Sequence, residues 1–160
     1  MKKILLLIFF SLFFVSNSNA ACDDPLTDGV DYSKCRFSDA QDLQGSYLPN
    51  SNLSFASFVQ VNLDKSIMMN SNLSFGTFPE STFVRANLYE TISIGGNFEK
   101  TNFTNANLTR VDFMGATLIE ANFTSANITN ANFENANLIG ATWTNGKTCG
   151  PDSIGTCIEQ

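Results

Sequence analysis

Residues 101–140 read TNFTN ANLTR VDFMG ATLIE ANFTS ANITN ANFEN ANLIG, and every group of five repeats one pattern. The third residue is large and apolar, the first is usually small, and the second is most often Asn. The same spacing extends outward from this stretch: the third-place residue, or centre, recurs at every fifth position from Leu43 to Trp143. This makes twenty-one units, and Ser93 is the one centre that is not large and apolar.

A period of five matches neither of the common secondary structures. An amphipathic helix places apolar residues three and four apart, and a half-buried strand places them two apart. A short repeat that keeps its register over a long stretch of chain indicates a solenoid, because each unit can bury its apolar residue only by stacking on its neighbours.

Units such as ANLTR at 106–110 and ANFEN at 131–135 resemble the pentapeptide-repeat family. The resemblance implies an all-β fold, a right-handed quadrilateral parallel β-helix in which four units complete one coil. It also implies that the centre and the residue two places before it face inward, while the other three residues face outward. Residues 43–143 would then form a β-helix of about five coils.

Centres that lie twenty residues apart should stack on each other in such a coil. Phe recurs in runs, such as Phe58, Phe78, Phe98 and Phe83, Phe103, Phe123. These runs predict ladders of stacked rings inside the rod. The unit TISIG at 91–95 inverts the pattern, with Ser93 inward and Ile92 and Ile94 outward. A local bulge that turns Ile92 or Ile94 inward is therefore predicted.

The N-terminal segment has the organisation of a secretory signal peptide. Lys2 and Lys3 precede an apolar run over 4–15, and Ser18-Asn19-Ala20 follows. The run is shorter than the roughly 20 residues of a bilayer span, so no stable membrane anchor is expected. Residues 1–20 are predicted to be removed near Ala20, which would place the protein in the periplasm or outside the cell.

The net charge of the mature chain argues against two classes of partner. Removal of Lys2 and Lys3 would leave seven basic against fifteen acidic residues, a net charge of −8. Such a surface disfavours binding to nucleic acid or anionic lipid.

The four cysteines lie outside the repeat, in an N-terminal cap (21–42) and a C-terminal cap (144–160). An even number in an exported chain indicates two disulfides, with three connectivities open. The ends of the rod that the resemblance implies are too far apart for a bond that needs Cα atoms within about 7 Å. Cys22–Cys35 and Cys149–Cys157 are therefore expected, each stapling a cap over an end of the rod.

Two other uses of the cysteines are disfavoured by the sequence. A zinc site is disfavoured because the chain has no His and no Cys-x-x-Cys. Lipidation of Cys22 would leave Cys35 without a partner, and Asn19 stands where such signals carry an aliphatic residue. The two end segments resemble those of exported pentapeptide-repeat proteins, for which the resemblance carries no common activity.

Catalytic, cofactor-binding and metal-binding residues are not expected. The absence of His excludes Ser-His-Asp and Cys-His arrangements. The acidic cluster Asp23, Asp24, Asp28 and Asp31 lacks the alternating spacing of a calcium loop and indicates a polar turn. Surface acids such as Glu80 and Glu120 are the only candidates for an acid-dependent hydrolase.

Outward apolar residues concentrate in the N-terminal half and predict a contact surface. The candidate partner-binding residues are Phe55, Val59, Phe75, Pro79, Tyr89 and Ile94. We therefore expect a non-enzymatic exported scaffold that binds a protein partner through its N-terminal coils. The alternatives are an envelope-structural protein without a discrete partner and, by resemblance, a DNA mimic that binds a type II topoisomerase; export argues against the latter, because that target is cytoplasmic. An end-to-end homodimer also fits the rod.

Overall fold

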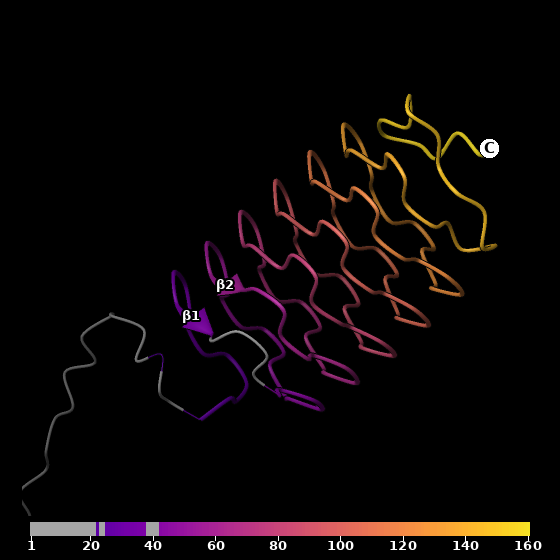
Figure 1. The fold of residues 1–160 in the computed structure, drawn as a ribbon. Helices are drawn as coiled ribbons and strands as arrows, with labels where there is room; N and C mark the ends of the chain where they lie inside the picture. The colour runs from indigo at the N-terminus through magenta and orange to yellow at the C-terminus, as the bar shows by residue number, and fades with distance from the viewer. Residues whose placement is uncertain (1–21, 23–24, 38–41) are drawn as a thin grey trace, which may run out of the picture.

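The computed structural model describes residues 22, 25–37 and 42–160, which form a rod of stacked rectangular coils (Figure 1). Strand β1 (Arg36–Phe37) pairs in parallel with β2 (Ser57–Phe58). The other sides of the coils pair through single-residue parallel bridges twenty residues apart, such as Asn62 with Thr82. The fold is the predicted right-handed quadrilateral parallel β-helix. The predicted signal peptide lies outside the described residues, as do Asp23 and Asp24.

The coils begin before Leu43. Asp31 bridges to Asn52 and Arg36 pairs with Ser57, an offset of twenty-one residues, whereas Asp42 bridges to Asn62 at the regular offset of twenty. Tyr32 and Phe37, which each follow one of these paired residues, are buried like the centres of later units. Part of the segment expected to be a cap therefore already has coil geometry.

Each corner of a coil is a tight turn that begins at a centre. The Leu53 carbonyl, for example, accepts a hydrogen bond from the Ala56 N–H at 3.1 Å. The residue two places after each centre has φ between 53° and 71° at every unit from Gly45 to Gly140. A positive φ at the third residue is the mark of a type II turn. The turn points this residue outward, so it is the most exposed place of most units.

The centre and the residue two places before it face inward, as the family resemblance implies. Their side chains fill the rod with stacked rings: Phe37, Phe58, Phe78 and Phe98 form one ladder, with ring centroids 4.2, 5.0 and 4.8 Å apart. Phe83, Phe103 and Phe123 form a second, with 5.3 Å at each step. Both predicted runs of Phe are confirmed as ladders.

The predicted bulge at 91–95 is wrong. The Ser93 side chain is fully buried, while Ile92 is 45% exposed. Ile92 keeps its bridges to Asn72 and Asp112, so the coil is regular on both sides. The backbone hydrogen bonds to the neighbouring coils hold the register, and they are retained even though Ser93 Oγ has no hydrogen-bond partner.

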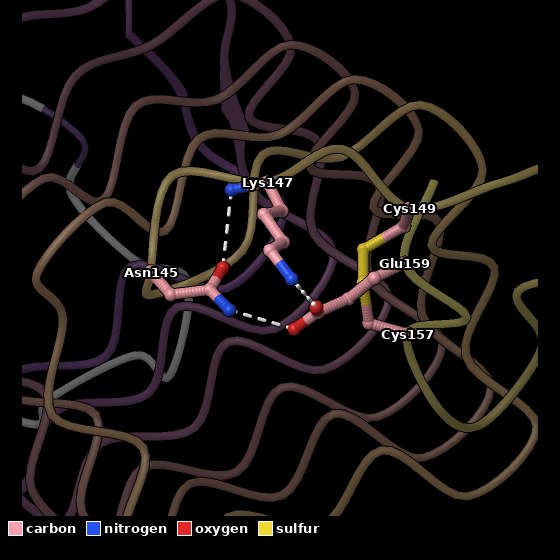
Figure 2. A network of polar contacts seen from close by, with 5 residues as sticks. All are labelled: Asn145, Lys147, Cys149, Cys157 and Glu159. Atoms are coloured by element: carbon pink, nitrogen blue, oxygen red, sulfur yellow. Dashed lines mark hydrogen bonds and ion pairs between the residues drawn. A yellow bond between two sulfur atoms is a disulfide. The ribbon is translucent and has the colours of Figure 1, made fainter.

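The C-terminal segment folds back over the last coil in the antiparallel direction. Thr142 bridges to Thr148, and Asn137 bridges to Ile154. The disulfide Cys149–Cys157 closes this cap, and Lys147 forms an ion pair with Glu159 at 2.7 Å (Figure 2). Asn145 Nδ2 donates to the same carboxylate, also at 2.7 Å. The cap covers the exposed edge on which another chain could otherwise pair.

A second disulfide joins Cys22 to Cys35 at the other end. The predicted pairing of the four cysteines is thus confirmed, and the Cys22 thiol that lipidation would need is in a disulfide. Disulfides persist in oxidising compartments, so the structure indicates an environment other than a reducing cytoplasm. Within the described ranges, no helix reaches the length and hydropathy of a membrane span.

Candidate functional site

Exposed large apolar side chains gather at one corner of the rod. Each corner presents two columns of turn residues, one and two places after the stacked centres. At this corner Phe55 and Phe75 lie in one column, and the half-buried Ile94 and the exposed Met114 lie in the other. Ile92 lies two residues before Ile94, on the adjoining side of the coil. We call these five residues the apolar corner. Phe55 is 56% exposed, Phe75 is 53% exposed and Ile92 is 45% exposed.

The two aromatic rings of the apolar corner stack on each other. Their centroids are 5.2 Å apart and their planes differ by 16°. Both residues have positive φ, 60° at Phe55 and 57° at Phe75, a backbone conformation that disfavours bulky side chains. Two large side chains are thus held outward at positions where Gly or Asn would cost less.

Glycine continues the column above the two rings. A Cβ on Gly95 would lie 2.7 Å from Cε1 of Phe75, so the ring lies directly against this glycine. At Gly115, one coil further, nothing lies within 4 Å of a Cβ position. Large side chains therefore project from this column at Phe55 and Phe75, whereas Gly115 has no side chain to project.

The neighbouring column has the opposite profile. Ser54 and Ser74 precede the two Phe residues, and Ser74 is buried. Ile94 and Met114 precede the two glycines, and Met114 is 36% exposed. Small residues flank the large ones in both halves of the corner.

The structure brings together three of the six predicted partner-binding residues, namely Phe55, Phe75 and Ile94. Val59 and Pro79 are half-buried and lie at the next corner of the coil. Tyr89 lies at the preceding corner, beside Arg110. The six residues therefore do not form one surface.

Sequence reasoning assigned Met114 to no site, because it lies in the mainly polar C-terminal half, and expected that Ile92 could turn inward. The signal for Met114 was present in the repeat itself. Met114 and Ile94 lie twenty residues apart and so occupy one outer column. Columns of outward residues would have located the apolar corner better than a comparison of the two halves.

In the two turn columns of the apolar corner, charged residues stand at the two ends and not between them. Lys34 lies one coil before Phe55 in the same column, a position called here the level below, because its N–H donates to the Ser54 carbonyl. Glu134 occupies the level above Met114, since the Gly115 N–H donates to its carbonyl. Asp112, on the adjoining side, accepts a hydrogen bond from Asn132 Nδ2 at 2.9 Å.

Outside the apolar corner Tyr47, Ile154 and Ile158 are also exposed, but most exposed residues are polar and the ion pairs are ordinary surface pairs. Arg110 Nη1 lies 2.8 Å from Glu90 Oε1, and Tyr89 together with Glu90 raises the pKa of Arg110. Glu80 and Glu120 lie two coils apart in one outer column, with Lys100 between them. Across the described ranges, no pocket and no metal-binding group of three or more acids or cysteines is found.

Comparison with models of protein families identifies the repeat. A profile described as pentapeptide repeats (8 copies) matches residues 35–74, and another described as pentapeptide repeats (9 copies) matches residues 98–146. Together the two matches span more than half of the chain. The chain belongs to the pentapeptide-repeat family. In this pentapeptide-repeat protein the unmatched segment between them, 75–97, contains the inverted unit at Ser93 and the Phe75–Gly95 contact.

Solved structures of other pentapeptide-repeat proteins are similar at low identity. The plasmid-mediated fluoroquinolone resistance protein QnrB1 is 21% identical, with a TM-score of 0.42 over 71% of this chain and 63% of QnrB1. A protein from the Arabidopsis thaliana thylakoid lumen is 17% identical, with a TM-score of 0.46 over 66% of this chain and 67% of that one. The present chain thus spans less than two thirds of QnrB1. None of the curated proteins compared with the chain matches it.

Proposed function

We propose that this pentapeptide-repeat protein is an exported, non-enzymatic scaffold that binds a protein partner through its apolar corner. The predicted signal peptide and the two disulfides support a location in the periplasm or outside the cell. The chain has no His, and the described acids lie on an outer surface without a pocket, which supports a binding role over a catalytic one.

One observation carries the proposal. Phe55 and Phe75 are each more than half exposed, yet they are ordered against each other and against Gly95. Burial of the exposed half of one such ring, about 100 Å², stabilises a complex by about 2.5 kcal/mol. Because the rings are already stacked, little conformational entropy is lost on binding. Adjacent aromatic residues of this kind are typical of the centre of a protein interface.

The test compares two variants in capture experiments from the envelope fraction of the producing organism. In one variant, Phe55→Asn is combined with Phe75→Asn. Asn is chosen because this chain already places Asn105, Asn130 and Asn135 at the same turn position with φ of 59°, 56° and 58°. The fold should therefore be retained while the aromatic surface is removed.

Tyr47→Asn is the matched control, since Tyr47 is 51% exposed on a different side of the rod. Capture of a stoichiometric partner by the wild type and by Tyr47→Asn, but not by the double Phe variant, supports the proposal. Equal capture by all three proteins contradicts it. An envelope-structural role without a partner predicts no stoichiometric complex with any of them.

A further inference from the structure

We infer that the partner of the apolar corner is a second copy of this chain, docked side by side with its rod in the antiparallel direction. The inference rests on the proposed function, because it uses the same surface and names what binds there. Three features of the corner lead to it: the order of large and small residues, the positions of its charges and its length.

The two turn columns of the corner have complementary profiles from the N-terminal to the C-terminal end. The outer column reads Lys34, Phe55, Phe75, Gly95, Gly115, Asn135. The column one residue earlier reads Ser33, Ser54, Ser74, Ile94, Met114, Glu134. In the first column the large side chains occupy the N-terminal half, and in the second the apolar ones occupy the C-terminal half.

This order is self-complementary under either twofold operation. A twofold axis along the rod places the two columns opposite each other in the same order, so that Phe75 faces Ser74 and Gly95 faces Ile94. A twofold axis that crosses the rod between the levels of Phe75 and Gly95 places each column opposite itself in reverse order. Phe55 then faces Gly115 of the second copy, where no residue other than the chain neighbours Met114 and Ala116 has an atom within 4 Å of a Cβ position. In the neighbouring column, Ser54 faces Met114 of the second copy. At the axis, Phe75 faces Gly95 of the second copy, against which that copy's own Phe75 ring lies, so the two Phe75 rings meet there.

The charges distinguish the two arrangements and select the antiparallel one. In the antiparallel dimer, Lys34 of each copy lies at the level of Glu134 of the other, so opposite charges meet at both ends. A twofold axis along the rod would instead place Lys34 against Lys34 and Glu134 against Glu134. Like charges at both ends disfavour that parallel dimer.

The size of the surface sets the expected affinity. Six levels at the spacing of stacked strands, about 4.8 Å, give a contact about 24 Å long. One corner of a rod is also narrower than the face of a standard interface, so the dimer should be weak, with a dissociation constant of about 1–100 µM.

The test is sedimentation velocity of the exported form over concentrations that bracket this range. The wild type should convert from monomer to dimer as concentration rises. The combined Phe55→Asn and Phe75→Asn variant should raise the dissociation constant at least about 30-fold, because it removes four exposed rings from the interface. Tyr47→Asn should behave as the wild type.

Charge reversal tests the direction of docking. Lys34→Glu alone and Glu134→Lys alone should each weaken the dimer about 3- to 10-fold, and the two together should restore it. Rescue is specific to the antiparallel arrangement, because Lys34 and Glu134 stand at opposite ends of the corner in one copy. Failure of the rescue contradicts this docking direction.

A wild type that stays monomeric over the whole range overturns the inference. A dimer that survives replacement of both Phe residues also overturns it, and would indicate association through another surface, such as the exposed Ile154 and Ile158 of the C-terminal cap. A monomeric protein that still captures a different envelope protein through Phe55 and Phe75 contradicts the self-association alone and leaves the proposed function standing.

Discussion

The Phe75 ring lies directly against Gly95 of the next coil, so close that a Cβ on Gly95 would stand 2.7 Å from Cε1 of the ring. Gly115 occupies the same column with a similar φ, 65° against 62°, but has nothing within 4 Å of a Cβ position. This pair of glycines separates the cost of backbone strain from the effect of contact with the ring.

We predict that Gly95→Ala and Gly115→Ala each lower the free energy of unfolding by about 1–2 kcal/mol, because both place a Cβ on a left-handed backbone. Only Gly95→Ala should also displace the Phe75 ring and weaken partner capture. Denaturant unfolding measures the first effect, and the NMR shifts of the Phe75 ring protons measure the second. Unchanged ring shifts in Gly95→Ala would show that the ring does not lie against this glycine.

Ser93 predicts a stabilising substitution. Its hydroxyl is buried in the core without a hydrogen-bond partner, and such a group costs about 1–3 kcal/mol. Ser93→Ala should therefore raise the free energy of unfolding by about 1 kcal/mol or more.

Ser71→Ala is the control, since the buried Ser71 hydroxyl donates to the Leu48 carbonyl at 2.6 Å and accepts from the Ser51 N–H at 3.1 Å. This substitution should destabilise the protein. A loss of stability in both variants would argue that Ser93 has a partner in solution.

The same residues show how much of the structure could be predicted from the sequence. The period of five predicted a solenoid. The resemblance to the pentapeptide-repeat family implied the quadrilateral β-helix, and the ladders of Phe and the pairing of the cysteines followed from that fold. The sequence-based prediction failed at Ser93, where the expected burial of Ile92 or Ile94 favoured a bulge. The Ser93 N–H donates to the Asp112 carbonyl at 2.8 Å and the Gly95 N–H to the Met114 carbonyl at 2.9 Å, bonds that a bulge would break.

The surface was harder to predict than the core. Tyr89 was grouped with Phe55 because both are outward apolar residues of the N-terminal half, but Tyr89 lies beside Arg110 at another corner. Which exposed side chains lie side by side depends on the column and the turn position, and which of them pair with a neighbour depends on side-chain contacts. The first can be counted along the chain, whereas the second required the structure.

Removal of the C-terminal disulfide should destabilise the cap. Replacing both Cys149 and Cys157 by Ser releases a loop whose ends are 8 residues apart, which should cost about 2–3 kcal/mol. The freed segment would uncover the last coil, so we also expect concentration-dependent aggregation through its unpaired edge. Calorimetry and light scattering measure the two effects. Wild-type stability in the double variant would show that the antiparallel pairing alone holds the cap.

The cap should also depend on pH. Hydrogen bonds from Lys147 and Asn145 hold the pKa of Glu159 below its ordinary value. A carboxyl whose folded pKa is lowered stabilises the fold above its unfolded pKa, and this contribution is lost as the pH falls through the folded pKa. The pKa of Lys147 is raised by the same pair, so its contribution is lost only as the pH rises above the ordinary lysine range.

Amide hydrogen exchange can follow this loss locally. The Gln160 N–H donates to the Thr148 carbonyl and the Gly150 N–H to the Ile158 carbonyl, so both amides report on opening of the cap. Their protection in the wild type should fall on acidification through the carboxyl range, after correction for intrinsic exchange. Glu159→Gln should remove most of this pH dependence. An unchanged profile in the variant would assign the acid sensitivity to another group.

Site-specific photo-crosslinking in the producing cell tests the central claim most directly. A photoreactive residue is placed at Phe55 and, as the matched control, at Asn105, which has the same turn position and φ at a different corner. We predict a discrete crosslinked protein, a second copy or another chain, from position 55 and none from position 105. No crosslink from position 55, or the same crosslinks from both positions, would contradict binding through the apolar corner.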